Sequence, residues 1–157
     1  DAGLIYKVHR VSKVEMQLKF YEDFDVFKIS PLDVGLLGAM TDVPASQLLV
    51  GDNCFTEFKG AFTECYVNEQ LARIQMPTYY FSGNDTEIEI DFAVQTENRV
   101  IPIEVKSEES VRSKSLKTYI DKNPSLKGLR VSMKNYIDQG WMENIGLYAI
   151  EGFLRKA

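Results

Sequence analysis

The sequence predicts an α/β fold in which a mixed sheet is flanked by helices, because its hydrophobic period changes in a fixed order. From Thr56 a long stretch with the apolar stripe of a helix runs to about Ile74 and stops before Pro77. Two runs of alternating apolar and polar residues follow, as in a β-hairpin, and helical spacing then returns. The expected elements are helices over 31–40, 56–74 and 114–121 and strands over 5–11, 26–29, 78–81, 87–96, 99–106, 128–133 and 146–150.

The hairpin over 87–106 sets its own register through a two-residue turn at Glu97-Asn98, where Asn tolerates a positive φ. With this turn, the apolar residues of both strands share one face and the acidic residues share the other. A slip of one residue would destroy that agreement. The expected cross-strand pairs are Thr96 with Arg99, Phe92 with Ile103 and Asp91 with Glu104. The expected apolar face holds Ile88, Ile90, Phe92, Val94, Ile101, Ile103 and Val105.

The expected pairing of Asp91 with Glu104 points to a site for a cation. Carboxylates directly opposite each other in a hairpin have Cβ atoms about 4.5–5.5 Å apart, where like charges are destabilising. Such a pair is retained when a cation lies between the two groups or when they share a proton. Mg²⁺ suits one or two carboxylates together with water and phosphate oxygens. The alternative is a solvated sheet face on which Glu104 and Lys106 serve solubility.

Asp91 and the tripeptide Glu104-Val105-Lys106 resemble the D…(D/E)-x-K signature of the restriction-endonuclease-like nuclease superfamily. The resemblance implies an αβββαβ core, which is the order of the expected elements. It also implies that Asp91, Glu104, Glu64 and the Val105 carbonyl hold Mg²⁺ or Mn²⁺, and that Lys106 orients the attacking water. Glu89 is an alternative carboxylate on the same face. The sequence departs from the pattern at Ile90, where proline would precede the aspartate.

The chain from about Val26 to Leu154 also resembles a narrower group, the C-terminal domain of a family of prokaryotic AAA-type ATPases. In that family a P-loop ATPase module precedes a domain long described as of unknown function. The matching segments are 27–38, 59–64, 89–92 and 101–107. The resemblance implies that residues 1–30 are the remnant of a winged-helix-like unit with a connector, and that residues 31–157 form the restriction-endonuclease-like domain. It further implies that the missing partner is the N-terminal ATPase module of the same chain.

Composition is that of an ordinary globular chain, with 157 residues, 45% of them hydrophobic and 26% charged. No apolar run approaches the roughly 20 residues that a membrane helix needs. No phosphate-binding loop of the type G-x-x-x-x-G-K-[ST] occurs, so no nucleotide site is expected here. Cys54 and Cys65 lack metal-type spacing and no signal peptide is visible, which favours the cytoplasm. His9, the single histidine, is expected on the surface of a strand.

The distribution of charge leaves two interpretations open. A net charge of −5 argues against nucleic acid binding over the whole surface. Basic residues are nevertheless concentrated between Lys106 and Lys134. This basic segment suits either a polyanionic substrate or a solvated helix face.

Three functions follow from these observations. The first is a metal-dependent nuclease that hydrolyses phosphodiester bonds in DNA or RNA, with Glu64, Asp91, Glu104 and Lys106 as its catalytic residues. The second is a catalytically inactive domain with the same fold, which recognises nucleic acid or protein for the ATPase. The third is a structural hairpin whose acidic face pairs with basic partners. Divalent-cation binding separates the first from the third.

Overall fold

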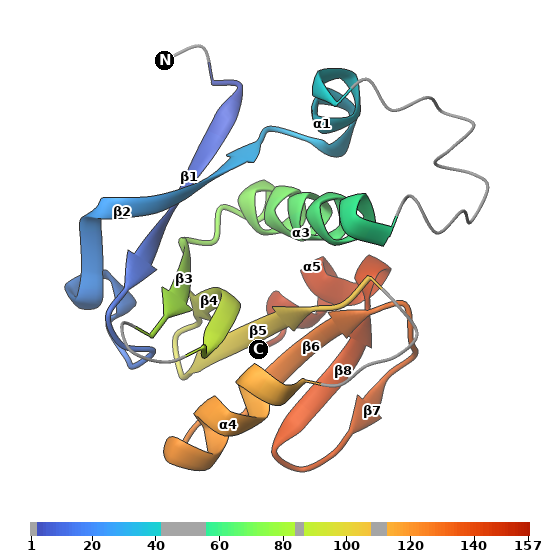
Figure 1. Ribbon diagram of the computed structural model, residues 1–157. Helices are drawn as coiled ribbons and strands as arrows, with labels where there is room; N and C mark the ends of the chain where they lie inside the picture. The colour runs from blue at the N-terminus through green and yellow to red at the C-terminus, as the bar shows by residue number, and fades with distance from the viewer. Residues whose placement is uncertain (1–2, 42–55, 84–86, 108–112) are drawn as a thin grey trace.

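A computed structural model describes residues 3–41, 56–83, 87–107 and 113–157, which form one mixed sheet of eight strands in the order β2-β1-β3-β4-β5-β6-β8-β7 (Figure 1). The strands are β1 (Ile5–Val11), β2 (Glu22–Pro31), β3 (Thr78–Ser82), β4 (Glu89–Gln95), β5 (Val100–Val105), β6 (Gly128–Ser132), β7 (Ile137–Asp138) and β8 (Met142–Gly146). The helices within the described residues are α1 (Val34–Met40), α3 (Thr56–Arg73), α4 (Lys114–Lys122) and α5 (Ile150–Leu154). Short 3₁₀ turns are η1 (Leu18–Tyr21) and η3 (Leu147–Ala149).

Helices cover both faces of this sheet and bury two cores (Figure 1). On one face, α3 and α5 pack Val67, Leu71 and Leu154 against the sheet. On the other face, α4 contributes Leu116 and Tyr119. The expected α/β class with a mixed, helix-flanked sheet is therefore confirmed.

The N-terminal hairpin belongs to the same sheet as the rest of the chain. Strand β1 pairs antiparallel with β2 and parallel with β3, so the segment 5–31 forms one end of the sheet. Helix α1 follows directly, and the Asp33 side chain caps it by accepting the backbone N–H of Leu36 at 2.7 Å. The derivation of residues 1–30 from a winged-helix-like unit stays a prediction.

The register of the central hairpin is confirmed from the pair Phe92–Ile103 to the turn, while the expected pair Asp91–Glu104 lies beyond the last ladder pair and stays a prediction. The expected apolar face is wrong in part. Phe92 pairs with Ile103, and the Thr96 N–H donates to the Arg99 carbonyl at 2.9 Å. However, Ile90 packs in the α4-side core while Phe92 packs in the α3-side core. The reason is a β-bulge. In the pairing of β3 with β4, Tyr79 lies opposite Ala93 but Phe81 lies opposite Ile90, so β4 carries one extra residue. The alternation therefore reverses at Asp91.

The strand expected over 146–150 is also wrong, because the last long strand is β8 (Met142–Gly146). Its sequence did not indicate a strand, since Asn144 is polar and yet fully buried. Hydrogen bonds explain this burial. The Asn144 side chain accepts from Arg130 at 2.7 Å and from Ser132 at 2.8 Å, and it donates to two backbone carbonyls. Residues 147–154 form η3 and α5 instead.

Candidate functional site

The predicted site residues come from three elements. Asp91 lies near the start of β4, Glu104 and Lys106 lie at the end of β5, and Glu64 lies in the middle of α3. Because β4 and β5 are antiparallel, the start of one strand and the end of the other meet at the same edge of the sheet. This is also the edge where the parallel strands β5, β6 and β8 end, a common place for ligand sites in α/β proteins.

Asp91 occupies the bulge, and its carboxylate is held by the neighbouring strand. Beyond the last ladder pair, the backbone N–H of Val105 donates to Asp91 Oδ2 at 2.7 Å. Burial raises the pKa of the Asp91 carboxyl to about 7, and the charges of Glu64 and Glu104 act in the same direction. The Val105 hydrogen bond and the charge of Lys28 oppose this shift. The site therefore holds a carboxyl group that titrates near neutral pH.

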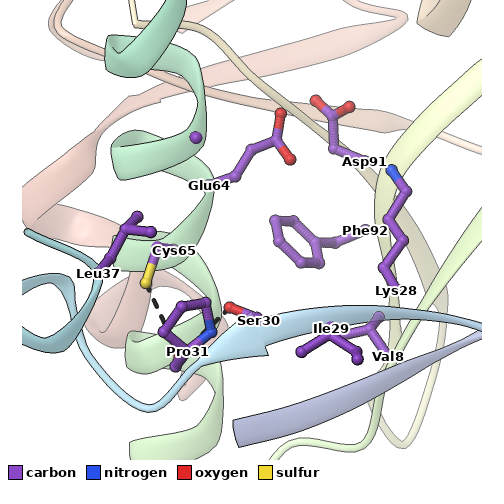
Figure 2. A pocket seen from close by; sticks show the side chains of 11 residues that line it. Val8, Lys28, Ile29, Ser30, Pro31, Leu37, Glu64, Cys65, Asp91 and Phe92 are labelled. Atoms are coloured by element: carbon purple, nitrogen blue, oxygen red, sulfur yellow. Dashed lines mark hydrogen bonds between the residues drawn. The ribbon is translucent and has the colours of Figure 1, made fainter. Parts of the chain in front are cut away.

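Glu64 reaches the same place from α3. Figure 2 shows the carboxylates of Glu64 and Asp91 turned toward each other at one end of a pocket. Burial raises the pKa of Glu64, and the charge of Glu89 contributes, while Lys28 and Lys106 act to lower this pKa. The structure thus brings the Glu64 side chain beside Asp91, as the sequence predicted, although its role as a ligand stays a prediction.

Glu104 and Lys106 form an ion pair at the end of β5. Lys106 Nζ lies 2.7 Å from Glu104 Oε1, and the Lys106 backbone N–H donates to the Val131 carbonyl at 2.9 Å. Glu104 is only 5% exposed, and its second oxygen, Oε2, has no hydrogen-bond partner among the described residues. A buried carboxylate oxygen without a partner is costly, so this atom fits a further cationic or hydrogen-bonding ligand.

Arg130 is the residue opposite Glu104 across β5 and β6, and it lies below the surface. Arg130 is 3% exposed and donates to Asn144. Burial lowers the pKa of Arg130, while the charge of Glu104 acts to raise it. The basic segment between Lys106 and Lys134 therefore does not form one exposed face. Within it, Lys117 pairs with Asp121 on α4.

Lys28 is a site residue that the sequence reasoning missed. It lies on β2, its ammonium contacts the Glu89 carboxylate, and it stands 4.7 Å from the centroid of the Tyr80 ring. Burial acts to lower the pKa of Lys28, but the hydrogen bond to Glu89 and the charges of Glu89, Glu64 and Asp91 outweigh it, so the pKa is raised. The sequence predicted one lysine of the site, Lys106, whereas the fold brings a second lysine, Lys28, beside the carboxylates.

A pocket of about 200 Å³ opens between β2 and α3 beside the carboxylates (Figure 2). Its walls are largely apolar and include Ile29, Leu37 and Phe92. Cys65 lines the pocket as a buried free thiol, with its Sγ 3.8 Å from the Pro31 carbonyl. Cys54, the other cysteine, lies outside the described residues, as does the segment 46–52, for which the sequence predicts a loop or short helix.

The donor set suits a hard divalent cation with few protein ligands. Within the described parts of the chain, no three Asp, Glu, His or Cys side chains are grouped closely enough to hold a metal ion together. Mg²⁺, however, commonly takes one or two carboxylates and completes its shell with water and phosphate oxygens. Asp91 and the unpartnered Oε2 of Glu104 fit such a site. Mg²⁺ or Mn²⁺ stays a prediction.

The fold and the clustered carboxylates describe an α/β domain with a polar site at the edge of a mixed sheet. The model of the family "Domain of unknown function (DUF4143)" matches residues 59–149, so the chain belongs to this family. No curated protein and no solved structure matches the chain. In addition, no helix among the described residues has both the length and the apolar character to cross a membrane.

Proposed function

We propose that this chain is the nuclease-like domain of a prokaryotic AAA-type ATPase, hydrolysing phosphodiester bonds in DNA or RNA with a divalent cation. The observation that carries the proposal is the meeting of Asp91, Glu64 and the Glu104–Lys106 pair at one edge of the sheet. The order α3, β3, β4, β5, α4, β6 supports a restriction-endonuclease-like αβββαβ core. The preceding winged-helix-like unit, the ATPase module and a cytoplasmic location belong to the same proposal.

In this proposal, the carboxylates of the site bind the metal ion and Lys106 orients the attacking water. Bound Mg²⁺ or Mn²⁺ would polarise a phosphate oxygen and favour ionisation of a water. Asp91, Glu104 and the Val105 carbonyl would hold the ion, and Glu64 would support it directly or through water. Lys106 would orient the attacking water, and the position of its ammonium 2.7 Å from Glu104 Oε1 supports this role.

A second candidate, a nuclease-fold domain without activity, is favoured by a specific observation. Lys106 pairs with Glu104, and Lys28 pairs with Glu89 beside the other carboxylates. Two lysines neutralise part of the acidic cluster without any metal. In that case the domain would bind nucleic acid or protein for the ATPase.

The test is metal-dependent cleavage of labelled single- and double-stranded DNA and RNA. The wild-type protein should cleave at least one substrate in Mg²⁺ or Mn²⁺ and none in EDTA, and Glu104→Gln should lose this activity. Glu143→Gln, a carboxylate change on β8, is the matched control and should retain it. Cation binding without cleavage of any substrate would favour the second candidate instead.

A further inference from the structure

The N-terminal hairpin contributes to a site whose other residues all lie in the family-matched segment. Glu64, Asp91, Glu104 and Lys106 fall within residues 59–149, whereas Lys28 lies on β2 outside it. The placement of β2 depends on β1, which joins the sheet through its parallel pairing with β3. One wall of the pocket beside the carboxylates is also built from β2, by Lys28 and the three residues after it.

The Lys28 side chain lines this pocket on the side of the carboxylates. Figure 2 shows the amine directed to the end where the carboxylates of Glu64 and Asp91 lie. The ammonium stands 4.7 Å from the centroid of the Tyr80 ring, which limits the orientations that the side chain can adopt. Lys28 remains 39% exposed, so a ligand can reach it.

An anionic ligand that binds beside these carboxylates needs a positively charged side chain to offset their negative charge. A phosphodiester approaching the site meets the negative charge of Glu64, Asp91 and Glu89. Lys106 is engaged by Glu104 on β5. An ammonium carries three N–H donors and Glu89 uses one, so Lys28 retains donors for an anion. Lysine commonly binds phosphate as a point charge.

We propose that Lys28 binds a phosphate of the nucleic-acid backbone next to the carboxylates, so that the hairpin of β1 and β2 completes the site. This inference rests on the proposed function, because it assumes that the ligand is a polynucleotide. It adds a residue and a structural element that the family-matched segment does not contain.

The experiment measures binding of a fluorescent single-stranded oligonucleotide in EDTA over a range of salt concentrations, so no metal and no cleavage are needed. Each phosphate contact contributes about 0.7 to the slope of log K against log salt for single strands. Lys28→Met should therefore reduce the slope by about 0.7 and weaken binding of all sequences alike. Lys28→Arg should restore most of the slope.

Lys7→Met is the matched control, because it removes the same charge from the neighbouring strand. Lys7 pairs with Ile29 and Lys28 pairs with Val8, so the two lysines point to opposite faces of the hairpin. Lys7→Met should leave the slope unchanged. Equal slopes for the wild type and Lys28→Met, or equal losses in the two variants, would overturn the proposal.

A double variant separates a direct contact from the neutralisation of Glu89. In Lys28→Met/Glu89→Gln, the lysine and its carboxylate partner are removed together. A direct phosphate contact predicts that the slope stays reduced, whereas a return to the wild-type slope would contradict it. If the wild type binds no nucleic acid in EDTA at any salt concentration, this inference fails, whereas the proposed function fails only if no substrate is cleaved in Mg²⁺ or Mn²⁺. Binding that is insensitive to Lys28 overturns only the inference.

Discussion

Replacing Asp91 by asparagine should stabilise the metal-free protein at high pH, and this gain in stability should disappear in acid. The Asp91 pKa is raised from 3.8 to about 7 in the folded chain, chiefly by burial. Between these two values the folded chain binds a proton that the unfolded chain has released. The stability of the wild type therefore falls as the pH rises through this window. Asparagine is neutral throughout and still offers an oxygen to the Val105 N–H.

The size of the effect follows from the shift. Each pH unit inside the window changes the free energy of unfolding by about 1.4 kcal/mol. From about pH 5 to about pH 7 the wild type should lose roughly 3 kcal/mol relative to Asp91→Asn. For a chain of this length, that corresponds to a change of about 6–12 °C in the difference between the two melting temperatures.

Thermal unfolding followed by circular dichroism in EDTA measures this difference directly. The melting temperature of Asp91→Asn minus that of the wild type should rise between about pH 5 and about pH 7 and level off above that. Asp121→Asn, an exposed carboxylate on α4, is the control and should show little pH dependence. A difference that is constant with pH, or that falls as the pH rises, would refute the assignment of Asp91 as a buried, charge-crowded carboxyl group.

Two further variants test the site and the fold. Lys106→Ala should reduce metal-dependent cleavage by about 100-fold or more, a typical loss for a group that orients or activates water, while metal-dependent stabilisation persists. Loss of that stabilisation as well would show that Lys106 maintains the site rather than acting on water. Tyr119→Phe should cost about 1–3 kcal/mol, because the buried Val14 N–H donates to the Tyr119 hydroxyl at 3.0 Å. Chemical denaturation measures this loss, and an unchanged midpoint would contradict it.

The local elements were predictable where one buried face dominates the sequence. The apolar stripe of α3 predicted a helix over 56–74, and the structure has it at Thr56–Arg73. The turn at 97–98 was sufficient to predict that Phe92 pairs with Ile103. In both cases the signal is local, since the side-chain period and the turn chemistry lie within a few residues of the contact.

The bulge in β4 was not predictable, because its cause is the pairing of β4 with β3. Ile88, Ile90 and Phe92 alternate regularly in sequence, and no glycine in β4 indicates an extra residue. Only the register against Tyr79 and Phe81 reverses the alternation. The sequence therefore predicted correctly that Asp91 belongs to the polar site, but it wrongly assigned Ile90 to the same face of the sheet as Phe92.

Lys28 and Asn144 were missed for a related reason, because their roles depend on partners distant in sequence. Lys28 contacts Glu89, which lies 61 residues away, through the position of β2 in the sheet. Asn144 is buried in a strand because Arg130 and Ser132, on the neighbouring strand, satisfy its side chain. Polar residues of this kind give no periodic signal, so they become visible only when the strands are assembled.

The most direct test of a divalent-cation site is the melting temperature in millimolar Mn²⁺ or Mg²⁺ at about pH 8. Mass action predicts stabilisation of about 3 kcal/mol when the ion is present at roughly 100 times its dissociation constant, which is several degrees for this chain. Asp91→Asn and Glu104→Gln should each abolish the increase and keep the fold, while Glu143→Gln should retain it. An equal increase in all four proteins, or none in the wild type, would contradict a cation site between Asp91 and Glu104.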